Sequence, residues 1–129
     1  MALIRPAVHR GLDLLTVIGF AVAPFLLALS GPPAWLAWLL AVVHLVMTLA
    51  TSFPDWPARF VSFRLHGLVE VLVGIVLPAL PLAAGWTGTA RWFYLIAGGV
   101  ILIVRLASAI DVGEAGQSAT SRGNSASRF

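Results

Sequence analysis

Four continuous apolar stretches, each close to the length of one membrane-spanning helix, constrain the fold of this chain more than any other feature. They are Leu12–Leu29, Ala34–Ala50, Leu65–Ala84 and Trp92–Ile110. A helix needs about 20 apolar residues to cross a bilayer, and a backbone in lipid must satisfy its own hydrogen bonds. Only 10% of the 129 residues are charged, against about 25% in soluble domains. The sequence therefore predicts an all-α integral membrane four-helix bundle whose main partner is the lipid bilayer.

The second half of the chain repeats the first at an offset of 57 residues. His66 follows His9 at this offset, and Glu70 follows Asp13. Further matches are Pro24 with Pro81, Gly31 with Gly88 and Trp35 with Trp92. The pattern predicts two tandem two-helix repeats. Because each copy has two spans, the copies run parallel, and we expect a pseudo-two-fold axis along the membrane normal to relate them.

These boundaries predict a four-span domain over residues 1–110 and a separate tail. The first repeat covers about 5–52 and the second about 62–109. Residues 111–129 are rich in Gly, Ser and Ala and show no hydrophobic periodicity. Such a segment cannot bury an apolar core, so it is predicted to form a disordered cytoplasmic tail.

The distribution of arginine predicts the orientation of the bundle. With four spans, the N-terminus, the central loop and the C-terminus share one side, and Arg91 is the only arginine expected on the other. Positively charged loops remain in the cytoplasm, so both termini are predicted to be cytoplasmic. The first apolar stretch looks like a signal peptide. Its duplicate lies in mid-chain, however, so we expect the first stretch to be retained in the mature protein.

The composition excludes several classes of function. The chain has no cysteine, which excludes thiolate metal sites and a cysteine nucleophile. The net charge of +3 comes from arginines scattered singly near segment ends, so we expect no nucleic-acid partner. The sequence also lacks a nucleophile elbow, a phosphate-binding loop, a dinucleotide fingerprint and a zinc-protease motif. No catalytic residues are predicted.

Each copy has a proline late in its first helix and a tryptophan opening its second, and each begins with a histidine followed by a carboxylate. Over residues 5–110 this arrangement resembles the SPW-repeat family of small bacterial membrane proteins. In that family, a two-helix unit carries Ser-Pro-Trp near the end of its first helix. Here the proline is present in both copies, as Pro24 and Pro81, while other residues replace the serine and the tryptophan. The resemblance implies the fold and a multi-pass location in the bacterial inner membrane, and it implies no established activity.

The two His–carboxylate pairs are the candidate functional residues. His9 and Asp13 are four residues apart, as are His66 and Glu70, so each pair lies on one helix face. One interpretation is a proton-exchanging or ion-binding site that faces the bundle interior. The other is structural, with each carboxylate orienting its own histidine or pairing with an arginine. Arg105 is the candidate partner for Asp13 or Glu70, unless its side chain extends to the head groups.

Three further expectations concern ligands and packing. The preferred interpretation has no cofactor and no metal, while haem held by His9 and His66, or zinc held by two histidines and two carboxylates, are the alternatives. His44 is expected to form a hydrogen bond with a neighbour such as Thr48. Gly67 and Gly74 are seven residues apart on one helix and are expected to allow close packing between the third and fourth helices.

These features favour a small, non-enzymatic accessory or scaffold subunit that acts through helix–helix contacts, as a homo-oligomer or within a larger membrane complex. A second interpretation is proton-linked transport or sensing through His9, Asp13, His66 and Glu70. A third is a small haem-binding or metal-binding membrane protein.

Overall fold

The computed structural model describes the backbone of residues 6–52 and 60–126 and the side chains of residues 7–52 and 60–108. Four helices make up this part of the chain: α1 (Pro6–Leu26), α2 (Gly31–Ala50), α3 (Phe63–Ala83) and α4 (Gly88–Ala126). Each has a segment long and apolar enough to cross a membrane. The predicted all-α fold with four candidate spans is therefore confirmed.

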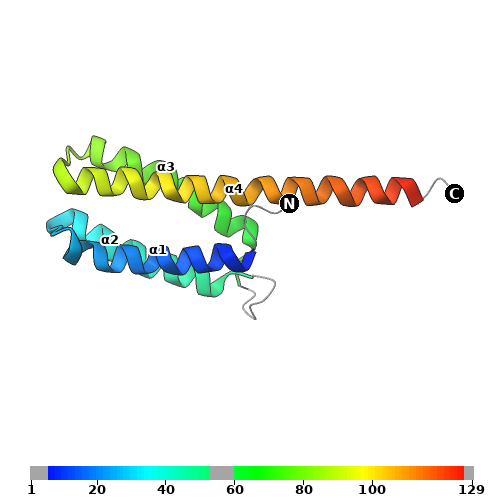
Figure 1. The fold of residues 1–129 in the computed structure, drawn as a ribbon. Coiled ribbons are helices and arrows are strands. Elements are labelled where there is room, and N and C mark those ends of the chain that lie inside the picture. Colours follow the sequence, from blue (N-terminus) through cyan, green and yellow to red (C-terminus); the bar gives the residue numbers. More distant parts are fainter. Residues whose placement is uncertain (1–5, 53–59, 127–129) are drawn as a thin grey trace.

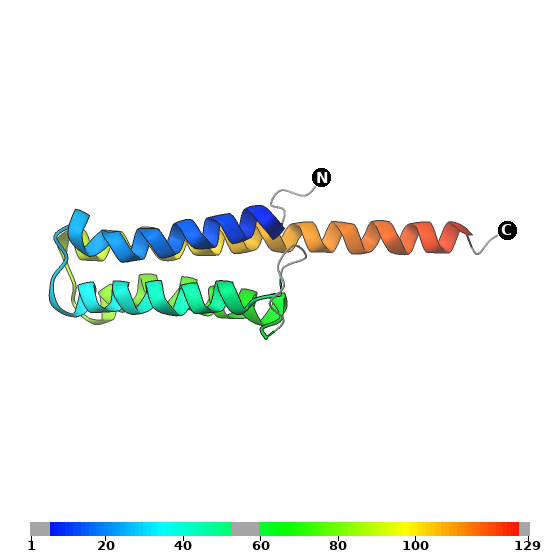
Figure 2. The ribbon, with the colours of Figure 1, turned by 90° about the horizontal axis from the view of Figure 1, so that it is seen from below.

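The helices form two antiparallel hairpins that point the same way (Figure 1). α1 packs along α2, and α3 packs along α4. Both hairpin turns lie at one end of the bundle, while the start of α1, the end of α2 and the start of α3 lie at the other (Figure 2). α4 continues well beyond this second end.

Both hairpin turns use the same helix-ending geometry. The carbonyl of Pro24 accepts a hydrogen bond from the N–H of Leu29 (3.0 Å), and the carbonyl of Pro81 accepts one from Trp86 (2.8 Å). This bond over five residues belongs to the Schellman motif, in which the residue before the donor adopts a left-handed backbone. That residue is Ala28 (φ 49°) in the first turn and Gly85 (φ 66°) in the second.

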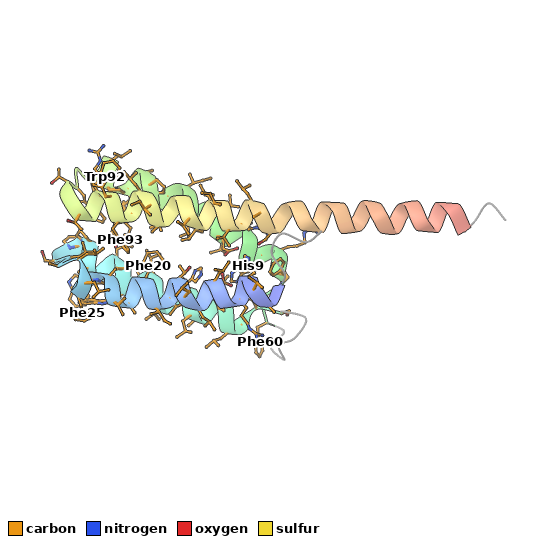
Figure 3. All side chains as sticks on the ribbon, viewed as in Figure 1. His9, Phe20, Phe25, Phe60, Trp92 and Phe93 are labelled. Atoms are coloured by element: carbon orange, nitrogen blue, oxygen red, sulfur yellow. The ribbon has the colours of Figure 1, made fainter. Side chains whose placement is uncertain are left out.

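Glycine residues set the packing within the second hairpin, and an aromatic pair packs between the two hairpins. A Cβ on Gly74 would lie 2.5 Å from Cγ of Leu102, and a Cβ on Gly98 would collide with Pro78. The predicted close packing of α3 on α4 through glycine is therefore confirmed. Between the hairpins, Phe20 meets Phe93 edge to face, with ring centroids 5.8 Å apart (Figure 3).

One buried polar contact ties the hairpins together at the end that carries both turns. Tyr94, in α4, is completely buried and donates a hydrogen bond of 2.5 Å to the carbonyl of Pro33, in the first turn of α2. Outward-facing side chains, by contrast, are mostly large and apolar on every helix, as Leu15, Val42 and Ile103 illustrate. This outer surface suits lipid better than water.

The structure differs from the predicted tail, because α4 continues as a helix to Ala126. The extra turns follow a long helix that is already formed, so they need no new nucleation. Residues 127–129 lie outside the described part, and a division into two domains near residue 110 stays a prediction.

Candidate functional site

The two predicted His–carboxylate pairs meet inside the bundle, at the end opposite the hairpin turns. His9 and Asp13 come from α1, and His66 and Glu70 come from α3. All four residues are buried, with exposed fractions of 0–5%. Figure 3 shows His9 directed into the space between the two hairpins. The spacing of four residues places each pair on one helix face, as the sequence predicted, and the structure turns both of these faces inward.

The ring nitrogens and carboxylate oxygens of the four residues face one another closely. Nε2 of His9 lies 3.6 Å from Oδ1 of Asp13 and 3.3 Å from Oε1 of Glu70. Nε2 of His66 lies 3.5 Å from Oδ2 of Asp13 and 3.6 Å from the same Glu70 oxygen. Each histidine thus faces the carboxylate of its own helix and that of the other hairpin. We call this set of four residues the His–carboxylate cluster.

Two hydroxyl groups orient the histidines by contacting Nδ1, the ring nitrogen that faces away from the carboxylates. The Ser108 hydroxyl donates to the carbonyl of Val104 and lies 2.9 Å from Nδ1 of His9. The Thr51 hydroxyl donates to the carbonyl of Met47 and lies 2.7 Å from Nδ1 of His66. Because each hydroxyl has one proton, already donated to a carbonyl, it accepts from the histidine. We therefore assign a proton to Nδ1 of each ring, while Nε2 faces the cluster.

Sequence reasoning missed these two hydroxyl groups, although a signal for them was present. Thr51 and Ser108 are 57 residues apart, the same offset that relates His9 to His66. Each lies at or just beyond the end of an apolar stretch, where a hydroxyl is common as a helix cap. Ser30 and Thr87 share the same offset, but they lie at the hairpin turns, whereas Thr51 and Ser108 lie at the end of the bundle that carries the histidines.

His44 of α2 joins the edge of the cluster. Its Nε2 lies 3.7 Å from Oδ1 of Asp13. The predicted bond with Thr48 takes another form, because the Thr48 hydroxyl donates to the backbone carbonyl of His44 (2.8 Å) rather than to its ring. A threonine within a helix commonly bonds to the carbonyl four residues earlier, which leaves the imidazole of His44 directed towards the cluster.

Arg105 lies beside the cluster rather than within it. Its guanidinium stands over the ring of Phe63, with Cζ 5.9 Å from the ring centroid, and packs against Gly67. Within the described residues, no ion pair joins Arg105 to Asp13 or Glu70. The structure thus places this candidate partner in a stacking contact on the outer side of α3.

The distances within the cluster suit a metal ion better than direct hydrogen bonds. Values of 3.3–3.6 Å exceed the usual N–H···O range of about 2.7–3.2 Å. Ligands at roughly 2.0–2.2 Å from a tetrahedral zinc ion lie about 3.4 Å from one another. One ligand atom from each of the four residues lies within 4.8 Å of all the others. Oδ2 of Asp13 and Oε2 of Glu70 are also buried without a hydrogen bond in the described structure.

Haem does not fit between the same histidines. A porphyrin held by two axial imidazoles needs a wide, flat slot between their Nε2 atoms. Here Oε1 of Glu70 lies within 3.6 Å of both Nε2 atoms, and Asp13 approaches both histidines from its own helix. The carboxylates therefore occupy the space that the porphyrin plane would require.

Comparison with known proteins gives no family for this chain. No family model matches it, and no curated protein or solved structure matches it significantly. The resemblance to the SPW-repeat family therefore stays a prediction.

Proposed function

We propose that this chain is a multi-pass membrane protein that binds one divalent transition-metal ion between its two helical hairpins. The observation that carries the proposal is the His–carboxylate cluster, with two imidazole nitrogens and two carboxylates converging at ligand spacing in a buried site. Imidazole and carboxylate together suit zinc, iron and manganese.

Charge supports a cation at this place. Asp13 and Glu70 bring two negative charges into a site whose residues are at most 5% exposed. Unpaired charges are costly in such surroundings. One divalent ion would neutralise both carboxylates while the histidines remain neutral. The hydroxyl groups of Thr51 and Ser108 would then serve as the outer partners that hold ligating histidines in the required tautomer.

The role that we propose for the ion is structural. The ligands come from α1 and α3, which belong to different hairpins, so a bound ion would join the hairpins directly. This role agrees with a non-enzymatic accessory subunit, acting through helix contacts. We extend the proposal to two tandem repeats in the bacterial inner membrane with cytoplasmic termini, supported by the 57-residue offset and the arginine bias.

Metal analysis of the purified protein tests the proposal. Protein extracted in mild detergent should carry about one metal ion per chain by inductively coupled plasma mass spectrometry. Asp13→Asn and Glu70→Gln keep the shape of each side chain while removing its charge, so each should lose most of the metal. Thr16→Val is the matched control, because Thr16 lies one turn from Asp13 on α1 and donates to its own helix at Leu12.

A proton-exchanging cluster is the second candidate, and one cavity favours it. A cavity of about 20 Å³ is lined by His44, His66 and Glu70 together with apolar side chains, which is room for about one water molecule. Such a water could pass protons between these groups. If wild-type protein is free of metal and binds none when Zn²⁺, Mn²⁺ or Fe²⁺ is added, the metal site is rejected and the proton-exchanging cluster remains.

A further inference from the structure

A groove on the outer side of α3 and α4 carries two positive charges. It has a volume of about 450 Å³ and is lined by Arg64, Leu65, Gly67, Leu68, Val71 and Arg105. Leu65 and Leu68 are about half exposed, so the groove opens away from the bundle. His66 and Glu70 face the His–carboxylate cluster, and Phe63 lies between that cluster and the groove, in contact with both His9 and Arg105.

The two arginines in the groove have no acidic partner among the described residues, where the ion pairs join histidines to Asp13 or Glu70. Arg64 is the second residue of α3, and Arg105 comes three residues before the end of the candidate span Gly88–Ser108. Both charges therefore lie at the depth where the apolar part of a bilayer gives way to the head groups.

Gly67 fixes the position of one of these charges. A Cβ at this residue would collide with the guanidinium of Arg105. The missing side chain thus lets Arg105 lie across α3 and face the same groove as Arg64. The guanidinium also stands over the ring of Phe63, one turn before Gly67 on the same helix, with Cζ 5.9 Å from the ring centroid.

We propose that this groove binds the phosphate head group of an anionic phospholipid. Two guanidinium groups without acidic partners supply the charge complementarity, and guanidinium binds phosphate oxygens through paired hydrogen bonds. Below them, Leu68 and Val71 continue the groove as an apolar surface against which an acyl chain packs. The combination of paired arginines above and apolar side chains below matches a lipid and not a soluble anion.

Lipid exchange observed by native mass spectrometry tests the proposal. The full-length protein in mild detergent is offered phosphatidylglycerol or phosphatidylcholine at equal concentration. Wild-type protein should retain phosphatidylglycerol preferentially. The double variant Arg64→Gln/Arg105→Gln should bind it about tenfold more weakly, since charge-assisted hydrogen bonds to both groups are lost. Arg91→Gln is the matched control, because Arg91 is exposed at the other end of the bundle and its loss should leave the preference unchanged.

Two further measurements separate this groove from a general attraction to anions. Gly67→Ala retains every charge but displaces Arg105, so it should reduce the preference while circular dichroism shows the helices intact. Glycerol phosphate, which has the head-group chemistry without acyl chains, should compete poorly. Equal retention of the two lipids by wild-type protein, or an unchanged preference in the double variant, would overturn the proposal. Competition by glycerol phosphate as strong as that of the lipid would also overturn it.

Discussion

The hydroxyl of Ser108 lies 2.9 Å from Nδ1 of His9, a residue 99 positions earlier in the chain. Thr51 stands in the same relation to His66 in the other half of the bundle. Each contact joins one hairpin to a histidine whose Nε2 faces two carboxylates. The hydroxyl groups therefore determine which nitrogen of each histidine is available to the His–carboxylate cluster.

Loss of either hydroxyl should weaken metal binding without abolishing it. Ser108→Ala or Thr51→Val leaves Nδ1–H of one histidine without its acceptor, so that ring is free to turn and to change tautomer. Loss of such outer partners costs about 10–100-fold in metal affinity. Competition with a coloured chelator measures the change. Thr51→Ser is the control that retains the hydroxyl. A metal affinity equal to wild type in both Ser108→Ala and Thr51→Val would contradict the role of the hydroxyl groups in metal binding.

Acid should release the metal. Protons compete with the ion for Nε2 of His9 and His66 and for both carboxylates, because ligands bind in their deprotonated forms. Affinity should therefore fall as the pH is lowered, and the release of protons on binding should rise in the acidic range. Isothermal titration in two buffers of different ionisation enthalpy counts these protons. An affinity that does not change between neutral and mildly acidic pH would argue against histidine ligation.

Replacing Ala28 by glycine should stabilise the first hairpin turn. Ala28 adopts a left-handed backbone (φ 49°) at the position where the second turn has Gly85. A residue with a Cβ is strained there, so Ala28→Gly should raise the free energy of unfolding by about 1 kcal/mol. Thermal unfolding in detergent measures the effect. Gly85→Ala makes the reverse change in the second turn and should destabilise by a similar amount.

Packing of α3 on α4 should depend on Gly74 but not on Gly99. A Cβ at Gly74 would lie 2.5 Å from Cγ of Leu102, whereas a Cβ at Gly99 meets no atom within 4 Å. Gly74→Ala should therefore destabilise the protein by about 1–3 kcal/mol through overpacking. Gly99→Ala, on the same pair of helices, should be neutral or slightly stabilising because alanine favours a helix. The melting temperature in detergent should therefore be lower for Gly74→Ala than for Gly99→Ala.

The sequence predicted the helices and the inward pairs because both depend on local rules. Apolar run lengths located the spans, and a spacing of four residues placed His9 with Asp13 on one face. The sequence could not give the distance from α1 to α3, because that distance depends on side-chain contacts between the hairpins, such as Phe20 with Phe93, which local patterns do not reveal. The approach of His44 to Asp13 likewise depends on the rotation of α2, which an almost uniformly apolar helix does not reveal.

The position of Arg105 and the end of α4 were also not predictable from the sequence. An arginine inside an apolar stretch suggests an ion pair, but the gap left by Gly67 offers its guanidinium a place on the outer side of α3. The composition beyond residue 110 suggested disorder. Composition alone does not show that this segment continues a long helix that begins at Gly88.

Tyr94 fastens the two hairpins at the end that carries both turns, and the His–carboxylate cluster joins them at the opposite end. Contacts between the hairpins therefore differ in character along the bundle. The Tyr94 hydrogen bond and the Phe20–Phe93 contact involve no ionisable pair, whereas the opposite end depends on histidines, carboxylates and the two hydroxyl groups that contact the histidines. A change of pH or of a bound cation therefore acts on the end of the bundle opposite the turns, while the Tyr94 hydrogen bond at the other end contains no group that titrates near neutral pH.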